Sequence, residues 1–132
     1  MFVDTSAIVA LLAQEADAPT YADKISGVGQ CYTSGLVVLE ASMRLATMLD
    51  MDPVLVESDI RRLLAEADIE IMPIDGIVAT AAVKAFAQYG KGRGHPAQLN
   101  LADCMSYGCA KVHDLPLLFK GADFSKTDIE VA

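Results

Sequence analysis

Short apolar segments separated by longer amphipathic ones constrain the fold of this chain more than any other feature. Each short segment has the length and composition of a buried strand, and strands that alternate with helices form a parallel sheet with helices on both faces. The sequence therefore predicts one α/β domain over residues 1–132, with three layers, α/β/α, around a central parallel sheet of four to five strands. The expected strands are 2–4, 30–33, 69–74 and 116–119, with 127–131 as a candidate fifth.

Polar caps and prolines mark where the intervening helices begin. Thr5 or Ser6 is expected near the cap of the first helix, and Pro19 suits the first turn of the second. The expected helices are 6–13, 19–27, 35–49, 53–67, 76–89 and 101–111. Residues 90–96 contain three glycines and a proline, so this segment is expected to be irregular.

Composition excludes several classes of protein. The chain is 53% hydrophobic and 21% charged, which is typical of a folded domain and not of a disordered one. No apolar run approaches the ~18 residues of a membrane-spanning helix, and the first residues lack the basic region of a secretory signal. The cysteines Cys31, Cys104 and Cys109 form no C-x-x-C pair, which favours free thiols over a zinc site. We therefore expect a cytoplasmic protein with no membrane association.

The charge of the chain is strongly acidic, with a formal net charge of −8 and a pI near 4.5. Taken alone, this charge argues against a nucleic-acid partner, because phosphate contacts require cations. Two bound Mg²⁺ ions would offset about four of the negative charges. The charge therefore leaves nucleic-acid binding open, and the remaining excess suits a protein partner with a basic segment.

Four carboxylates lie beside apolar segments in separate parts of the sequence. Asp4 ends the first expected strand and Asp123 follows the last, so both fall at the carboxyl edge of a parallel sheet, where ligands bind. Glu40 lies inside an apolar helix, and Asp103 stands three residues after the helix cap Asn100. Acids that converge repel one another unless a cation joins them. The set therefore predicts a site for a hard divalent metal, Mg²⁺ or Mn²⁺.

Each acid also has an ordinary structural interpretation: a helix cap for Asp4, an i, i+4 ion pair with Arg44 for Glu40, a capping box with Asn100 for Asp103, and a turn for Asp123, which Asp128 could replace as the fourth acid. For Glu40, the ion pair and metal binding are compatible.

The chemistry that such acids support is metal-assisted hydrolysis of a phosphodiester. A carboxylate-bound metal lowers the pKa of its water, and a second ion can stabilise the leaving oxygen. His95 and His113 have no evident partners in sequence, so no Ser-His-Asp or Cys-His set is available. Residues 90–96 supply Lys91 and Arg93, which could bind RNA phosphates; a solvated connection is the equally open alternative.

The four acids lie in four sequence motifs: Phe2-Val3-Asp4-Thr5-Ser6-Ala7, Leu39-Glu40-Ala41, Leu99-Asn100-Leu101-Ala102-Asp103-Cys104 and Leu117-Leu118-Phe119-Lys120-Gly121-Ala122-Asp123-Phe124-Ser125-Lys126-Thr127-Asp128-Ile129. In these motifs, taken in order, the chain resembles the PIN-domain ribonucleases and, within them, the VapC toxins of bacterial toxin–antitoxin pairs. Residues 89–93 also resemble a stretch of one VapC subgroup. The resemblance spans essentially the whole chain.

This resemblance implies a single PIN domain that cleaves RNA endonucleolytically with Mg²⁺ or Mn²⁺, leaving 5′-phosphate and 3′-hydroxyl ends. It also implies a homodimer, a VapB-type antitoxin as partner, and a hydroxyl from Thr5 or Ser6 near the metal. One departure is Ala102, where the subgroup commonly has Gly. The implied catalytic and metal-binding residues are Asp4, Glu40, Asp103 and Asp123.

Two other functions use related features. A phosphotransfer receiver or phosphatase also has an acidic Mg²⁺ pocket in an α/β domain, but it needs adjacent acids after the first strand, and this chain has Asp4-Thr5-Ser6 there. A PIN-fold protein could also bind an antitoxin without cleaving RNA. All four acids are present, so the sequence gives no sign of lost activity.

Overall fold

A parallel sheet of four strands forms the centre of the computed structural model, which describes residues 1–132. The strand order is β3-β2-β1-β4, and every pairing is parallel. Phe2 of β1 pairs with Tyr32 on one side and with Leu117 on the other. The strands are β1 (Phe2–Val3), β2 (Cys31–Ser34), β3 (Ile69–Met72) and β4 (Leu117–Leu118). The predicted α/β class and parallel sheet are therefore confirmed.

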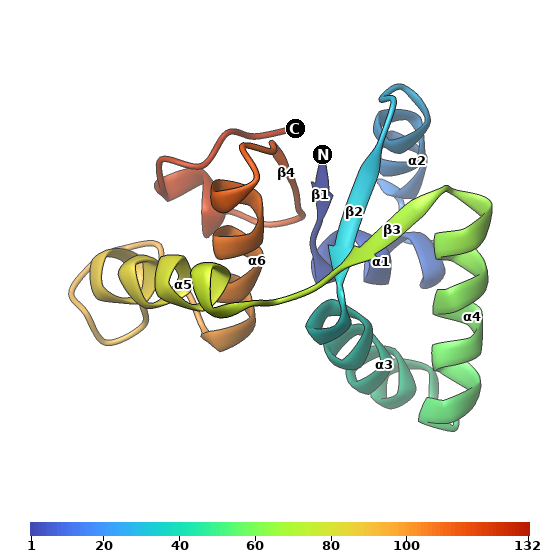
Figure 1. Ribbon diagram of the computed structural model, residues 1–132. Coiled ribbons are helices and arrows are strands. Elements are labelled where there is room, and N and C mark those ends of the chain that lie inside the picture. The colour runs from blue at the N-terminus through green and yellow to red at the C-terminus, as the bar shows by residue number, and fades with distance from the viewer.

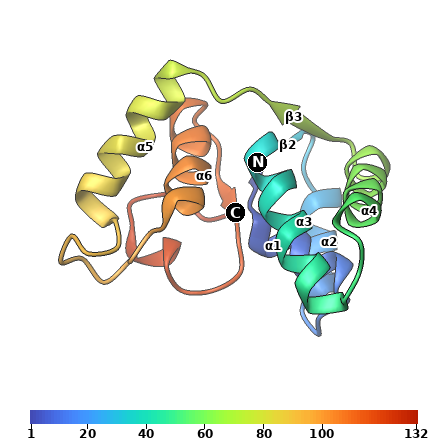
Figure 2. The ribbon, with the colours of Figure 1, turned by 90° about the horizontal axis from the view of Figure 1, so that it is seen from below.

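Six helices cover the two faces of this sheet. Helices α1–α4 lie on one side and α5 and α6 on the other, which gives the three expected layers (Figure 1). The view from below shows the same division (Figure 2). No helix has both the length and the apolar character that crossing a bilayer requires. The helices are α1 (Thr5–Leu12), α2 (Ala18–Ser26), α3 (Gly35–Leu49), α4 (Pro53–Glu66), α5 (Gly76–Tyr89) and α6 (Leu101–Val112).

The strand order reverses direction beside β1. From β1 the chain moves through β2 to β3 on one side, and β4 returns on the other side of β1. Phe2, Val3, Leu117 and Leu118 are almost completely buried, as expected for strands covered on both faces. In an open parallel sheet, such a reversal of strand order opens a crevice at the carboxyl ends of the strands. The fold therefore places a site just beyond Val3.

The start of α1 differs from the sequence-based expectation. The cap is Asp4, whose carboxylate accepts a hydrogen bond from the backbone N–H of Ser6 at 3.0 Å, and not Thr5 or Ser6. Asp4 is the one residue between Val3, which ends β1, and Thr5, which begins α1, and its backbone is still extended. Asp4 therefore caps α1 and also lines the crevice.

The predicted fifth strand over 127–131 does not form. A single bridge joins Leu117 to Val131, and the backbone N–H of Leu117 donates to the carbonyl of Glu130 at 2.8 Å. Further strand pairing is prevented because Thr127 folds into a turn, with its hydroxyl donating to the carbonyl of Phe124 at 2.7 Å. The segment is a tail laid along β4 and not a strand.

Residues 90–96 are irregular, as predicted, and backbone hydrogen bonds on either side of them close the loop. The N–H of Lys91 donates to the carbonyl of Leu99, and the N–H of Leu99 donates to the carbonyl of Tyr89, both at 2.9 Å. The rings of Tyr89 and His95 meet edge to face with centroids 4.9 Å apart. These contacts argue against a purely solvated connection.

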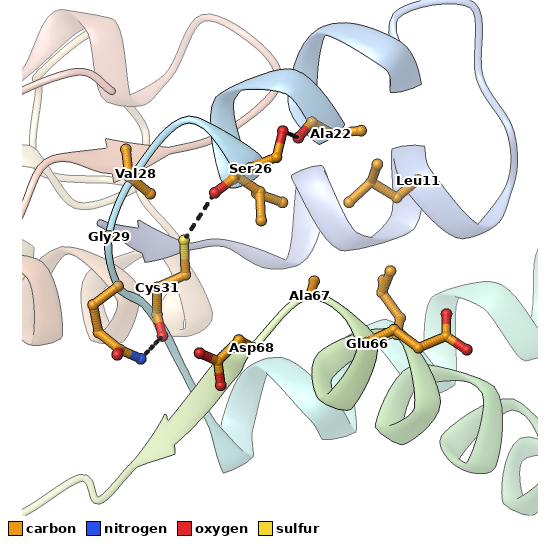
Figure 3. A pocket seen from close by; sticks show the side chains of 12 residues that line it. Leu11, Ala22, Ser26, Val28, Gly29, Cys31, Glu66, Ala67 and Asp68 are labelled. Carbon is orange, nitrogen blue, oxygen red and sulfur yellow. Dashed lines mark hydrogen bonds between the residues drawn. The ribbon is translucent and has the colours of Figure 1, made fainter.

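A cavity of about 340 Å³ lies at the opposite, amino-terminal edge of the sheet (Figure 3). Leu11, Val28 and Ala67 form part of its wall, and the Cys31 thiol lies 3.9 Å from the carbonyl oxygen of Ile25. Burial raises the pKa of this thiol. Because Cys104 and Cys109 are also buried and unpaired, all three cysteines are packing residues, in agreement with the expected free thiols.

Asp128 joins the C-terminal tail to the α5–α6 layer. Its carboxylate accepts hydrogen bonds from the hydroxyls of Tyr89 and Tyr107 and from the Lys111 ammonium group at 2.9 Å. The hydrogen bond from Tyr107, followed by that from Lys111, lowers the Asp128 pKa to about 2. Asp128 therefore stabilises the tail as a carboxylate.

We expect Asp128→Ala to lower the free energy of unfolding by about 1–2 kcal/mol at pH 7, a value reduced because the ion pair with Lys111 is exposed. The native carboxylate has a pKa of about 2, below its ordinary value of 3.8, so its stabilisation is present above pH 4 and disappears as the pH falls toward 2. Urea unfolding at pH 7 and pH 3 measures both effects. Glu130→Ala, in the same tail, is the matched control, and an equal loss in that variant would contradict the role of Asp128.

Candidate acidic active site

One cleft at the carboxyl edge of the sheet brings the four sequence-predicted acids together. It has a volume of about 230 Å³, and only one of its ten lining residues is hydrophobic. The acids come from four different places: the end of β1, helix α3, the start of α6 and the segment after β4. The carboxylates that line it are those of Asp4, Glu40, Asp103 and Asp123.

The Asp4 carboxylate is fixed by Ser6. One of its oxygens, Oδ2, accepts hydrogen bonds from the backbone N–H of Ser6 at 3.0 Å and from its hydroxyl at 2.6 Å. The same hydroxyl accepts from the backbone N–H of Lys120 at 2.9 Å. Ser6 therefore joins the first acid to the segment that carries the fourth, while Oδ1 of Asp4 is left for a ligand.

The two candidate hydroxyls have different environments. The Ser6 hydroxyl both donates and accepts within the protein, so its role in the structure is to orient Asp4. The Thr5 hydroxyl is buried and has no hydrogen-bond partner in the protein. A buried hydroxyl without a partner is unusual, and Thr5 is not among the residues that line the acidic cleft.

Glu40 reaches the cleft because α3 begins directly after β2. Ser34 ends β2 and caps α3, with its hydroxyl accepting from the N–H of Val37 at 3.3 Å. Glu40 follows in the second turn and is half-buried. The i, i+4 ion pair between Glu40 and Arg44 does not form, although both side chains line the cleft.

Asp103 forms the capping box that the sequence indicates. The N–H of Asp103 donates to the Asn100 side chain at 2.9 Å, and the N–H of Asn100 donates to Asp103 Oδ2 at 3.0 Å. Burial, and to a smaller extent the negative charges of Asp4, Glu40 and Asp123, raise the pKa of Asp103 to about 6, against the lowering effect of the Asn100 N–H. The four acids therefore repel one another, and a cation would relieve that repulsion.

Asp123, and not Asp128, is the fourth acid of the cleft. Phe124 is buried and its ring packs 5.1 Å from that of Phe119, which anchors both sides of the turn that carries Asp123. The Asp123 carboxylate makes no hydrogen bond as a cap and lines the cleft. Asp128 is turned away, toward Tyr107 and Lys111.

The donor set fits Mg²⁺ or Mn²⁺, because it consists of carboxylate oxygens with no sulfur or imidazole ligand. No three acidic, histidine or cysteine side chains lie close enough to hold one ion by direct contacts alone. Mg²⁺ usually keeps several waters and takes only one or two carboxylates, so this spacing suits a partly hydrated ion. Of the four acids, Asp4 and Asp103 have carboxylates that hydrogen bonds hold in place.

Two cations line the cleft, and sequence reasoning assigned neither to it. Lys120 forms ion pairs with Glu15 and, at 2.9 Å, with Asp17, which raise the pKa of its ammonium group. Arg44 forms no ion pair. The position of Lys120 depends on the contact of its backbone with Ser6, which is distant in sequence, so local patterns carry no signal for it. Arg44 lies one turn after Glu40 on α3.

Lys91 and Arg93 lie beside the acidic cleft and not in it. Lys91 lines an apolar cavity of about 420 Å³ between α5 and α6, and Asn100 lines both this cavity and the acidic cleft. The Arg93 guanidinium lies 5.8 Å from the centre of the Phe86 ring. The two cations are therefore near a surface that adjoins the acids.

Comparisons with known proteins show which proteins the chain is similar to. The model of the PIN domain family matches residues 1–130. The chain is 39% identical to Ribonuclease VapC28 of Mycobacterium tuberculosis over 132 residues, covering 100% of this chain and 97% of that protein. It is 38% identical to Ribonuclease VapC42 of the same species, covering 100% and 98%. A toxin–antitoxin complex from Klebsiella pneumoniae has a similar fold, with a TM-score of 0.70 and 17% identity over 99% of this chain and 95% of that one.

Proposed function

Because the chain belongs to the PIN domain family, we propose that it is a divalent-metal-dependent endoribonuclease and the toxin of a toxin–antitoxin module. One observation carries this proposal: four acids from distant segments line a single cleft, and their charges act together on the pKa of Asp103. The full-length similarity to proteins named VapC ribonucleases supports RNA as the substrate. A single PIN domain over residues 1–132 and a location in the bacterial cytoplasm are part of the proposal.

The proposed roles follow from how each residue is held. Asp4 and Asp103 bind the ion, Glu40 and Asp123 complete the negative wall of the cleft, and Ser6 fixes the orientation of Asp4. A bound Mg²⁺ or Mn²⁺ would polarise the phosphodiester and lower the pKa of the attacking water. The carboxylates relieve their own repulsion by holding this ion, so substrate hydrolysis and ion binding depend on the same residues.

The proposed binding partners of the chain are inferred from its surface and from its family. Lys91 and Arg93 are proposed RNA contacts, supported by their place beside a cavity that shares Asn100 with the acidic cleft. A VapB-type antitoxin is the proposed protein partner, and the net charge of −8 suits a partner with a basic segment. A homodimer is proposed from exposed apolar side chains on α5 and α6, among them Val83 and Leu101.

The phosphotransfer alternative receives no support from the site. Glu40 and Asp103 are carried by helices, and no second acid lies beside Asp4 at the end of β1.

The proposal predicts that the purified chain cleaves single-stranded RNA in Mn²⁺, that excess EDTA stops cleavage, and that added Mn²⁺ restores it. Gel analysis of end-labelled RNA measures the rate, and end mapping should show 5′-phosphate and 3′-hydroxyl products. Parallel assays in Mg²⁺ decide which ion serves better. Cleavage that continues at the same rate in EDTA would contradict the proposed metal dependence.

A further inference from the structure

Arg44 is a cation of the acidic cleft that forms no ion pair with a protein carboxylate. It lies on α3 one turn after Glu40, lines the cleft and is exposed. It forms neither an ion pair nor a side-chain hydrogen bond, although the i, i+4 spacing to Glu40 would allow one. The guanidinium group therefore remains available to an anion that enters the cleft.

The second cation of the cleft is not available in this way. The Lys120 ammonium group is held between Glu15 and Asp17 in the segment between α1 and α2, and the Lys120 backbone is bound to Ser6. Moving this side chain toward a substrate would break two ion pairs. Arg44 can contact a substrate without losing any such interaction.

The charge of the cleft shows why an available cation matters there. One divalent ion would neutralise about two of the four carboxylates, so the cleft would keep a negative charge that repels an RNA phosphate. A guanidinium group binds phosphate oxygens through two parallel hydrogen bonds, and these are stronger than hydrogen bonds between neutral groups. An arginine at the wall of the cleft therefore supplies the attraction that the acids and their ions do not.

We propose that Arg44 is a substrate-binding residue that holds a phosphate of the RNA strand in the acidic cleft. This inference rests on the proposed ribonuclease function and assigns one contact of its substrate. Arg44 binds the polyanion and not the metal ion, so its loss affects RNA affinity and leaves the ion requirement unchanged.

The test compares wild type, Arg44→Ala, Arg44→Lys and Arg61→Ala in Mn²⁺ with a fluorogenic single-stranded RNA. Arg61 is the matched control, because it is an exposed arginine on α4 that pairs with Glu57 outside the cleft. We expect Arg44→Ala to raise KM about tenfold or more and to make log kcat/KM against log salt shallower by about 0.7. Arg44→Lys should recover part of both effects, and Arg61→Ala should match wild type.

The half-saturating Mn²⁺ concentration separates this role from others. It should be the same in wild type and Arg44→Ala. Unchanged KM and salt slope in Arg44→Ala, with an active wild type, would overturn the Arg44 assignment alone. A lower Mn²⁺ requirement at unchanged KM would also overturn it, because Arg44 would then act as a counterion of the acids. A wild type that cleaves no RNA would overturn the ribonuclease function and the Arg44 role together.

Discussion

Asp103→Asn is expected to reduce Mn²⁺-dependent RNA cleavage by about 100- to 1,000-fold, because a metal ion contributes several kcal/mol of charge stabilisation to hydrolysis. The substitution removes one negative charge from the cleft and keeps the shape of the side chain. Asparagine can still accept the hydrogen bond from the Asn100 N–H, so the capping box at the start of α6 should survive. A loss of cleavage in Asp103→Asn would therefore indicate a lost contact with the metal ion and not a disrupted helix.

Stability measurements provide the control for this variant. The Asp103 pKa of about 6 lies above its ordinary value of 3.8, so above pH 6 the charged form costs folding free energy. Without metal at pH 7.5, Asp103→Asn should therefore be at least as stable as wild type in thermal unfolding. Asp59→Asn on α4, where Asp59 pairs with Arg62, should retain full cleavage. Wild-type cleavage rates in Asp103→Asn would remove Asp103 from the proposed site.

Local patterns in the sequence predict the helices and strands well, because the start and end of a helix or strand depend on neighbouring residues. The capping box of Asn100 and Asp103 is one example, since both residues are three positions apart and the helix begins between them. Helix α3 is another: its predicted bounds, 35–49, match the structure because Ser34 precedes it and an apolar face runs through it. The parallel sheet follows from the alternation of such elements.

Contacts between distant segments are not predictable in the same way. The sequence favours Asp123 as the fourth acid and leaves Asp128 as its alternative, and the contacts of Asp128 with Tyr89, Tyr107 and Lys111 show that it lies outside the cleft. The predicted strand at 127–131 fails for the same reason, because those contacts and the Thr127 turn hold the tail away from a full ladder. The i, i+4 rule likewise suggested a Glu40–Arg44 pair that does not form.

Gly108 is a further residue whose role depends on a distant contact. Within a helix, glycine is less favourable than alanine by about 1 kcal/mol, so the sequence alone marks Gly108 only as a weak point of α6. In the structure, a Cβ at this position would lie 2.9 Å from the Val78 carbonyl oxygen and 3.1 Å from the Ala82 nitrogen, both backbone atoms of α5. These atoms cannot move without shifting α5, so the absence of a side chain sets the spacing of the two helices.

Gly108→Val is therefore expected to lower the free energy of unfolding by about 3 kcal/mol or more, a large share of the 5–15 kcal/mol typical of a domain. Gly108→Ala should also destabilise, because the clash outweighs its better helix propensity. Urea unfolding followed by circular dichroism measures both variants. Gly35→Ala is the control, because a Cβ there meets nothing within 4 Å, and it should be neutral or slightly stabilising. Wild-type stability in Gly108→Val would mean that α5 and α6 are not held this closely, and the position of Asp103 on α6 would then need another explanation.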